Sequence, residues 1–186
     1  MRTPVLLIAL MLTACSGQPD YRAENQPPET VPHVDIERYQ GLWYEIARYP
    51  NRFEDTPDYI CTAVTAEYAL REDGRIDVIN TCRKDTPEGE VDVANGVARV
   101  VGGNGAKLKV KFAPAWVPFA SGDYWVLDLT EDYSAALVGS PDGKYLWLLS
   151  RTPIIPAETG RRLMEAARAR GYQTDPLQFT LQPPAR

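Results

Sequence analysis

Residues 107–112 read Lys107-Leu108-Lys109-Val110-Lys111-Phe112, a strict alternation of cationic and apolar side chains. Successive side chains of a β-strand point to opposite faces, so the three apolar residues share one face and the three lysines share the other. Alternation of this kind is typical of an antiparallel strand with one buried and one solvated face. The stretch therefore predicts a protein built on an antiparallel sheet.

Short strand patterns occur on both sides of this stretch, with turn sequences between them. They cover residues 41–50, 62–70, 76–81, 97–101, 122–130, 135–139 and 145–151. One helix is expected over residues 156–170, with Leu163 and Ala167 on an apolar face that packs outside the sheet. Residues 177–181 are a candidate ninth, edge strand. The pattern predicts an all-β fold, an eight-stranded antiparallel up-and-down β-barrel with one C-terminal α-helix.

The expected connections alternate in length along the chain. Three are tight turns, at residues 72–74, 102–105 and 131–134. Most of the others are longer, at residues 51–61, 83–95 and 113–121. Alternate connections of such a barrel lie at opposite ends, so we expect a cup with a closed floor and an open mouth. The interior is either filled by side chains or holds one small ligand, and both alternatives fit the sequence.

Composition bounds the possible functions. The chain has 186 residues, 44% of them hydrophobic, which is sufficient for one packed domain. Its net charge of -5 is spread without a basic block, so no nucleic-acid partner is expected. With His33 as the one histidine, a His/Cys metal site is not expected, nor is a cofactor. We therefore expect a binding protein and not an enzyme; a small lipid-modifying enzyme and a structural lipoprotein with a filled barrel are the alternatives.

The N-terminus carries export signals. Arg2 precedes the apolar run 5–11, which is too short to cross a bilayer and is typical of a signal peptide. Residues 12–15 (Leu-Thr-Ala-Cys) resemble the bacterial lipobox, in which the cysteine is acylated and becomes the mature N-terminus. In bacterial lipoproteins, a residue other than Asp after this cysteine implies outer-membrane location, and Ser16 stands there.

These signals divide the chain into three parts. Residues 1–14 are expected to be a lipoprotein signal peptide, and residues 15–33 an acylated Cys15 with a proline-rich, solvated tether. Residues 34–186 are expected to form the barrel domain. The chain is then lipid-anchored in the outer membrane, with its domain facing the periplasm.

Three separated motifs resemble those of the lipocalin family. Residues 41–47 (Gly-Leu-Trp-Tyr-Glu-Ile-Ala) contain its Gly-x-Trp pattern. Asp128, Asp132 and Tyr133 resemble its second motif with extra residues, and residues 148–151 (Leu-Leu-Ser-Arg) resemble its third. The resemblance implies a lipid-binding protein that stores or transports fatty acids or lysophospholipids for envelope maintenance under stress.

The resemblance also implies roles for particular residues. Trp43 and Arg151 are expected to close the barrel floor, with the arginine over the indole face. Strand parity and the family register give the expected barrel lining: Val64, Ala66, Tyr68, Val78, Asn80, Ala98, Val100, Leu108, Val110, Phe112, Tyr124, Val126, Tyr145 and Trp147. Such a lining suits an acyl chain. Glu45 shares the parity of Trp43 and, if buried, needs a partner.

The expected rim residues are Arg52, Phe53, Trp116 and Phe119. Arg52 either holds a carboxylate or phosphate head group or is solvated. The apolar loop 113–119 has three interpretations: a lid over the mouth, a contact with a membrane or with a second copy in a homodimer, or packing on a neighbouring loop.

Cys61 and Cys82 remain as a pair in an oxidising compartment, where disulfides form. A regular hairpin around residues 72–74 places Cys82 opposite Val64, however, about 10 Å along the strand from Cys61. A disulfide needs closer Cα atoms. A β-bulge, or a loop conformation in which Cys61 folds back, would remove this objection.

Overall fold

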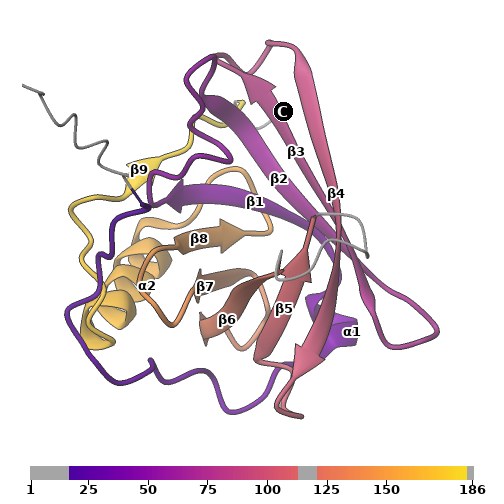
Figure 1. Cartoon of the computed structure of the whole chain (residues 1–186), viewed down its shortest axis with the longest axis vertical. Coiled ribbons are helices and arrows are strands. Elements are labelled where there is room, and N and C mark those ends of the chain that lie inside the picture. Colours follow the sequence, from indigo (N-terminus) through magenta and orange to yellow (C-terminus); the bar gives the residue numbers. More distant parts are fainter. Residues whose placement is uncertain (1–16, 113–120, 184–186) are drawn as a thin grey trace, which may run out of the picture.

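The computed structural model describes residues 17–112 and 121–183. Eight antiparallel strands close into a barrel, because β1 pairs with both β2 and β8 (Figure 1). The strands are β1 (Gly41–Arg48), β2 (Cys61–Leu70), β3 (Ile76–Lys84), β4 (Val91–Val101), β5 (Lys107–Lys111), β6 (Ser121–Leu129), β7 (Ala135–Gly139) and β8 (Leu146–Ser150). The predicted barrel is thus confirmed. In the described ranges, no helix is both long and apolar enough to cross a membrane.

Two helices and a ninth strand complete the fold: α1 (Ile36–Tyr39), α2 (Ala157–Ala169) and β9 (Gln178–Phe179). Helix α2 packs outside the barrel, beside β6, β7 and β8, as predicted (Figure 1). Leu163 and Ala167 of α2 are buried there. The barrel wall therefore separates two apolar cores, one in the interior and one under α2.

The segment containing α1 crosses the closed end of the barrel and contacts the tight turns there. Val34 N donates a hydrogen bond to the Asn104 carbonyl at 2.9 Å, and the Arg38 guanidinium donates to the Glu131 carbonyl at 3.0 Å. Gly105 has a φ of 74°, and a Cβ there would lie 2.1 Å from the Val34 carbonyl oxygen. Only glycine permits this close approach, which helps seal the floor.

Strands β3 and β4 are longer than the sequence analysis expects. Residues 91–96 (Val-Asp-Val-Ala-Asn-Gly) continue β4 and pair with β3, from Val91 opposite Arg83 to Gly96 opposite Val78. The expected loop 83–95 is therefore wrong, and the connection spans only residues 85–90. Asp, Asn and Gly are depleted in strands. Pairing with β3 outweighs this local preference.

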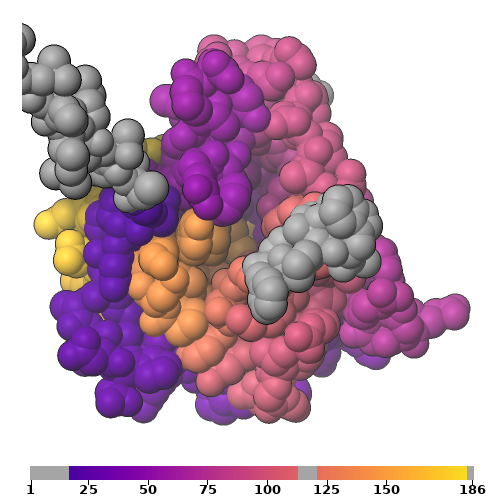
Figure 2. Space-filling view, viewed as in Figure 1, coloured from indigo at the N-terminus to yellow at the C-terminus, as the bar shows by residue number. Residues whose placement is uncertain are grey.

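Residues 17–33 do not form the solvated tether that their composition suggests. They lie along the barrel surface, as the indigo segment in Figure 2 shows. Tyr21 N donates to the Gly143 carbonyl and Val31 N to the Val126 carbonyl, each at 3.1 Å. The Tyr21 ring also packs edge-on against Tyr49, with centroids 4.8 Å apart. Prolines remove donors only at their own positions, so the residues between them still dock on the barrel.

Cys61 and Cys82 form a disulfide, and a β-bulge makes it possible. The pairing of β2 with β3 shifts by one residue between Thr62 and Thr65. Ala63, inside the bulge, has a φ of 46°. The cysteine Cα atoms consequently lie 5.4 Å apart, within the normal range for a disulfide.

Candidate functional site

The barrel floor is closed by Trp43 and Arg151. Trp43 is fully buried, and its indole Nε1 donates to the Tyr39 carbonyl at 2.9 Å. The Arg151 guanidinium carbon lies 3.9 Å from the centre of the Trp43 ring, which is the predicted cation–π contact. Arg151 also donates to the carbonyls of Leu42 and Tyr39, at 2.8 and 3.1 Å. These contacts join α1, β1 and the end of β8.

Ten of the fourteen expected lining residues belong to the apolar cluster in the barrel interior. They are Ala66, Tyr68, Val78, Ala98, Val100, Leu108, Val110, Tyr124, Val126 and Trp147. Strand alternation and the family register therefore place these side chains in the same interior cluster as the structure does.

The other four lie apart from this cluster. Val64 packs with the disulfide, and Asn80 is half-buried on β3. Phe112 is 46% exposed, just past the end of β5. Tyr145 stacks on Trp147 with ring centroids 5.5 Å apart. Val64 is therefore buried beside the disulfide and not in the main interior cluster.

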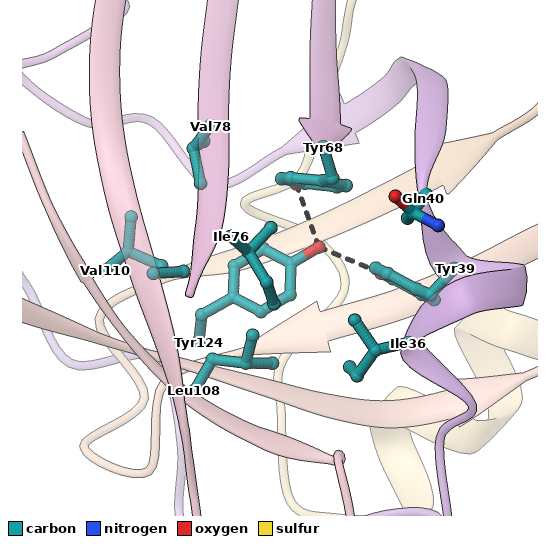
Figure 3. A pocket seen from close by; sticks show the side chains of 10 residues that line it. Ile36, Tyr39, Gln40, Tyr68, Ile76, Val78, Leu108, Val110 and Tyr124 are labelled. Carbon is teal, nitrogen blue, oxygen red and sulfur yellow. Dashed lines mark hydrogen bonds between the residues drawn. The ribbon is translucent and has the colours of Figure 1, made fainter. Parts of the chain in front are cut away.

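A pocket lies at the closed end of the interior, next to α1 (Figure 3). About 320 Å³ of space free of atoms lies at this pocket when the adjoining open solvent is included. Its lining consists of Ile36, Tyr39, Gln40, Tyr68, Ile76, Val78, Ala98, Leu108, Val110 and Tyr124. This lining is mostly apolar with a few polar groups, which is the usual character of a small-molecule binding pocket.

Buried charged residues lie farther along β1, toward the open end. Glu45 and Arg48 are each 2% exposed. Both face inward because Ile46 bulges between them and shifts the register with β8. Arg48 contacts Glu45 at 2.8 Å, Glu54 at 3.1 Å and Asp55 at 2.5 Å. Arg48 is thus the partner that a buried Glu45 requires.

If the carboxyl groups around Arg48 were all ionised, three negative charges would face one positive charge in a buried site. Such repulsion between like charges favours protonation of one carboxyl group. Burial and the neighbouring Glu45 carboxylate raise the pKa of Glu54 to about 8, although Arg48 and Asn51 act in the opposite direction. Glu54 therefore carries a proton at neutral pH. In the described parts of the chain, no group of His, Cys, Asp or Glu residues is placed to hold a metal ion.

The residues around and after β9 fill the gap where β1 and β2 separate. Thr180 N donates to the Ile46 carbonyl of β1 at 3.0 Å, and Ala63 N of β2 donates to the Leu181 carbonyl at 2.7 Å. The Gln182 side-chain amide donates to one carbonyl on each strand. The C-terminal segment therefore completes the barrel wall beside the buried charges.

At the open end, Phe53 stacks on Tyr145 with ring centroids 6.0 Å apart. The corresponding segments lie next to each other in Figure 2, in purple and orange. Arg52 lies over the Phe53 ring, 5.7 Å from its centroid. The other expected rim residues, Trp116 and Phe119, lie outside the described residues.

Sequence reasoning missed Ile76, Tyr39 and Arg48. Ile76 continues the alternation of Val78, so a signal was present. Tyr39 belongs to a four-residue helix whose N-cap, Asp35, accepts from backbone N–H groups, and this cap was a second available signal. Arg48 had no local signal, because the bulge that turns it inward is invisible in the sequence.

Comparison with known proteins agrees with this geometry. Residues 34–182 match a family described as a lipocalin-like domain. The chain is 40% identical over 182 residues to the outer membrane lipoprotein Blc of Citrobacter freundii, covering 95% of this chain and 93% of that protein. It is 38% identical over 162 residues to temperature-induced lipocalin-1 of Arabidopsis thaliana, covering 86% and 85% of the two chains. Mouse (Mus musculus) apolipoprotein D is 29% identical over 181 residues, with 93% and 90% covered.

Solved structures share the fold at much lower identity. H1 crustacyanin from the lobster Homarus americanus superposes with a TM-score of 0.65 at 16% identity, over 89% of this chain and 92% of that chain. Insecticyanin from the tobacco hornworm Manduca sexta gives a TM-score of 0.63 at 19% identity, over 87% and 86%. With the barrel, its Trp43–Arg151 floor and the sequence relatives in agreement, the chain belongs to the lipocalin family.

Proposed function

We propose that the barrel binds one elongated lipid, a fatty acid or a lysophospholipid, and that the protein stores or transports it for envelope maintenance under stress. The observation that carries the proposal is the apolar interior cluster with a pocket at its closed end. Each methylene group moved from water into such an interior contributes about 0.8 kcal/mol. Binding is reversible desolvation of the acyl chain, without turnover.

The proposal includes attachment to the outer membrane through an acylated Cys15, with the domain in the periplasm. The lipobox resemblance of residues 12–15 supports it. So does the similarity to proteins named outer membrane lipoproteins, among them Blc of Escherichia coli at 37% identity over 176 residues. Cys15 itself lies outside the described residues.

Mass spectrometry of lipids that co-purify with the soluble domain tests the binding function directly. We expect a fatty acid or a lysophospholipid, and we expect added lipid to displace a fluorescent fatty acid from the delipidated protein. Absence of both co-purified lipid and displacement would refute the proposal. Release of product from lysophospholipid during incubation would favour a lipid-modifying enzyme instead.

Attachment is tested separately, by fractionation of cells that produce the full chain. We expect the protein in the outer-membrane fraction, and Cys15→Ser in the soluble fraction. Equal partitioning of the two forms would contradict the proposed anchor.

A further inference from the structure

Three tyrosine hydroxyl groups meet inside the barrel. Tyr39 comes from α1, Tyr68 from β2 and Tyr124 from β6 (Figure 3). The Tyr124 hydroxyl lies 2.9 Å from that of Tyr39 and 3.0 Å from that of Tyr68. The Tyr39 and Tyr68 rings stack with centroids 5.8 Å apart, and Tyr39 also packs on Trp43 at 4.8 Å. Ring packing therefore holds the three hydroxyls in place independently of their hydrogen bonds.

This tyrosine cluster has one more proton than its own hydrogen bonds use. Three hydroxyls carry three protons, and two hydrogen bonds join them, so one proton is left over whichever oxygen donates. No further hydrogen bond links these hydroxyls to the described part of the chain. The rest of the pocket lining is apolar except for Gln40, whose Oε1 already accepts from Leu70 N at 2.8 Å.

The cluster is suited to donate a hydrogen bond, because its three hydroxyl groups keep their protons. Burial raises the pKa of Tyr68 to about 12 and also raises the pKa of Tyr39 and Tyr124 above their ordinary value. All three side chains therefore remain neutral phenols. The positive charge of Arg151 acts at Tyr39 and Tyr68 in the direction that favours negative charge. A ligand oxygen that carries partial or full negative charge is therefore complementary to the free hydroxyl proton of the cluster.

We propose that the tyrosine cluster binds an oxygen atom at the inner end of the lipid ligand. This inference rests on the proposed lipid-binding function and adds a chemical class to it: an elongated apolar molecule with a hydrogen-bond acceptor at the end that reaches the floor. The acceptor is either the carboxyl group of a fatty acid that enters head first, or a hydroxyl at the far end of a chain whose head group stays at the mouth.

Three ligands of equal chain length separate these sources in a displacement assay with the delipidated domain. They are dodecanoic acid, 12-hydroxydodecanoic acid and dodecyltrimethylammonium, the last of which has no oxygen. The variant Tyr124→Phe removes the hydroxyl that joins the other two. Tyr44→Phe is the matched control, because Tyr44 lies next to Trp43 on β1 but packs with the core outside the barrel. Thermal unfolding and near-UV circular dichroism verify that both variants are folded.

Tyr124→Phe removes both hydrogen bonds of the cluster and leaves the hydroxyls of Tyr39 and Tyr68 without a partner in the described part of the chain. We expect it to change the affinity for at least one oxygen-ended ligand about fivefold, the effect of one hydrogen bond. Dodecyltrimethylammonium should bind with unchanged or higher affinity, and Tyr44→Phe should change none of the three. A changed affinity for both acids identifies a carboxyl group at the floor, and a changed affinity for the hydroxy acid alone identifies a terminal hydroxyl.

Two results would overturn the inference, and they are distinguishable. If the ligands bind the unaltered chain but Tyr124→Phe changes all three affinities equally or not at all, the cluster recognises no ligand oxygen and the lipid-binding function stands. If no ligand binds the unaltered chain, the lipid-binding function fails and this inference fails with it.

Discussion

The raised pKa of Glu54 predicts that the folded protein loses stability as the pH rises from 5 to 8. A carboxyl group in the unfolded chain titrates near its ordinary value of 4.5, whereas the Glu54 carboxyl in the fold titrates near 8. Between these values the folded state binds more protons than the unfolded state, so the free energy of unfolding falls with rising pH.

The magnitude follows from the same two values. Each tenfold change in proton affinity corresponds to about 1.4 kcal/mol, which gives an upper bound of about 5 kcal/mol for the whole pH window. The side chain of Glu54 is only 16% exposed, so solvent screening reduces this little. We expect about half of this upper bound, roughly 2–3 kcal/mol, over the whole pH window.

Urea unfolding at several pH values, with the disulfide kept oxidised, measures this loss. Glu54→Gln should abolish most of the pH dependence, because the amide mimics the protonated acid, and should make the protein more stable than the unaltered chain at pH 8. Glu67→Gln, at an exposed position on β2, should keep the full dependence. A stability that is constant or rises from pH 5 to 8, or an equal slope in Glu54→Gln, would refute the reasoning.

Other perturbations test the floor, the disulfide and the lining. Arg151→Ala removes the cation over Trp43 together with several hydrogen bonds to backbone carbonyls, and should lower the free energy of unfolding by about 2–4 kcal/mol, measured by thermal unfolding. A loss of less than about 0.5 kcal/mol would contradict the role of Arg151 at the floor. Replacing Cys61 and Cys82 by Ser should cost about 3 kcal/mol for their separation of 21 residues, and an unchanged unfolding midpoint would contradict this. Val110→Lys should abolish displacement of a fluorescent fatty acid while circular dichroism shows a folded barrel, and unchanged affinity would contradict the assigned lining.

Features with a local periodicity could be predicted from the sequence. The alternation around Leu108 predicted its strand and the face that it buries. The resemblance of residues 41–47 and 148–151 to the lipocalin motifs implied that Trp43 and Arg151 meet at the floor, as they do. The first inference needs only the two-residue repeat of a strand, whereas the second also needs the family motifs.

The rest depends on irregularities and on distant contacts. The bulge at Ile46 turns Arg48 into the interior, and a one-residue insertion of this kind leaves no trace in composition or alternation. The hydroxyl of Tyr39 meets those of Tyr68 and Tyr124 only after the chain has closed the barrel floor. The docked N-terminal segment was missed for the same reason, because its contacts are with distant parts of the chain such as Val126 and Gly143.

That docked segment also has a consequence for orientation. Gln18 is held at the open end, where its side-chain amide donates to the Pro50 carbonyl at 2.5 Å. Cys15 precedes it by three residues, which span at most about 11 Å of extended chain. Acyl chains on Cys15 would therefore hold the mouth of the barrel against the bilayer surface, so that a lipid leaving the membrane has almost no water to cross before it enters.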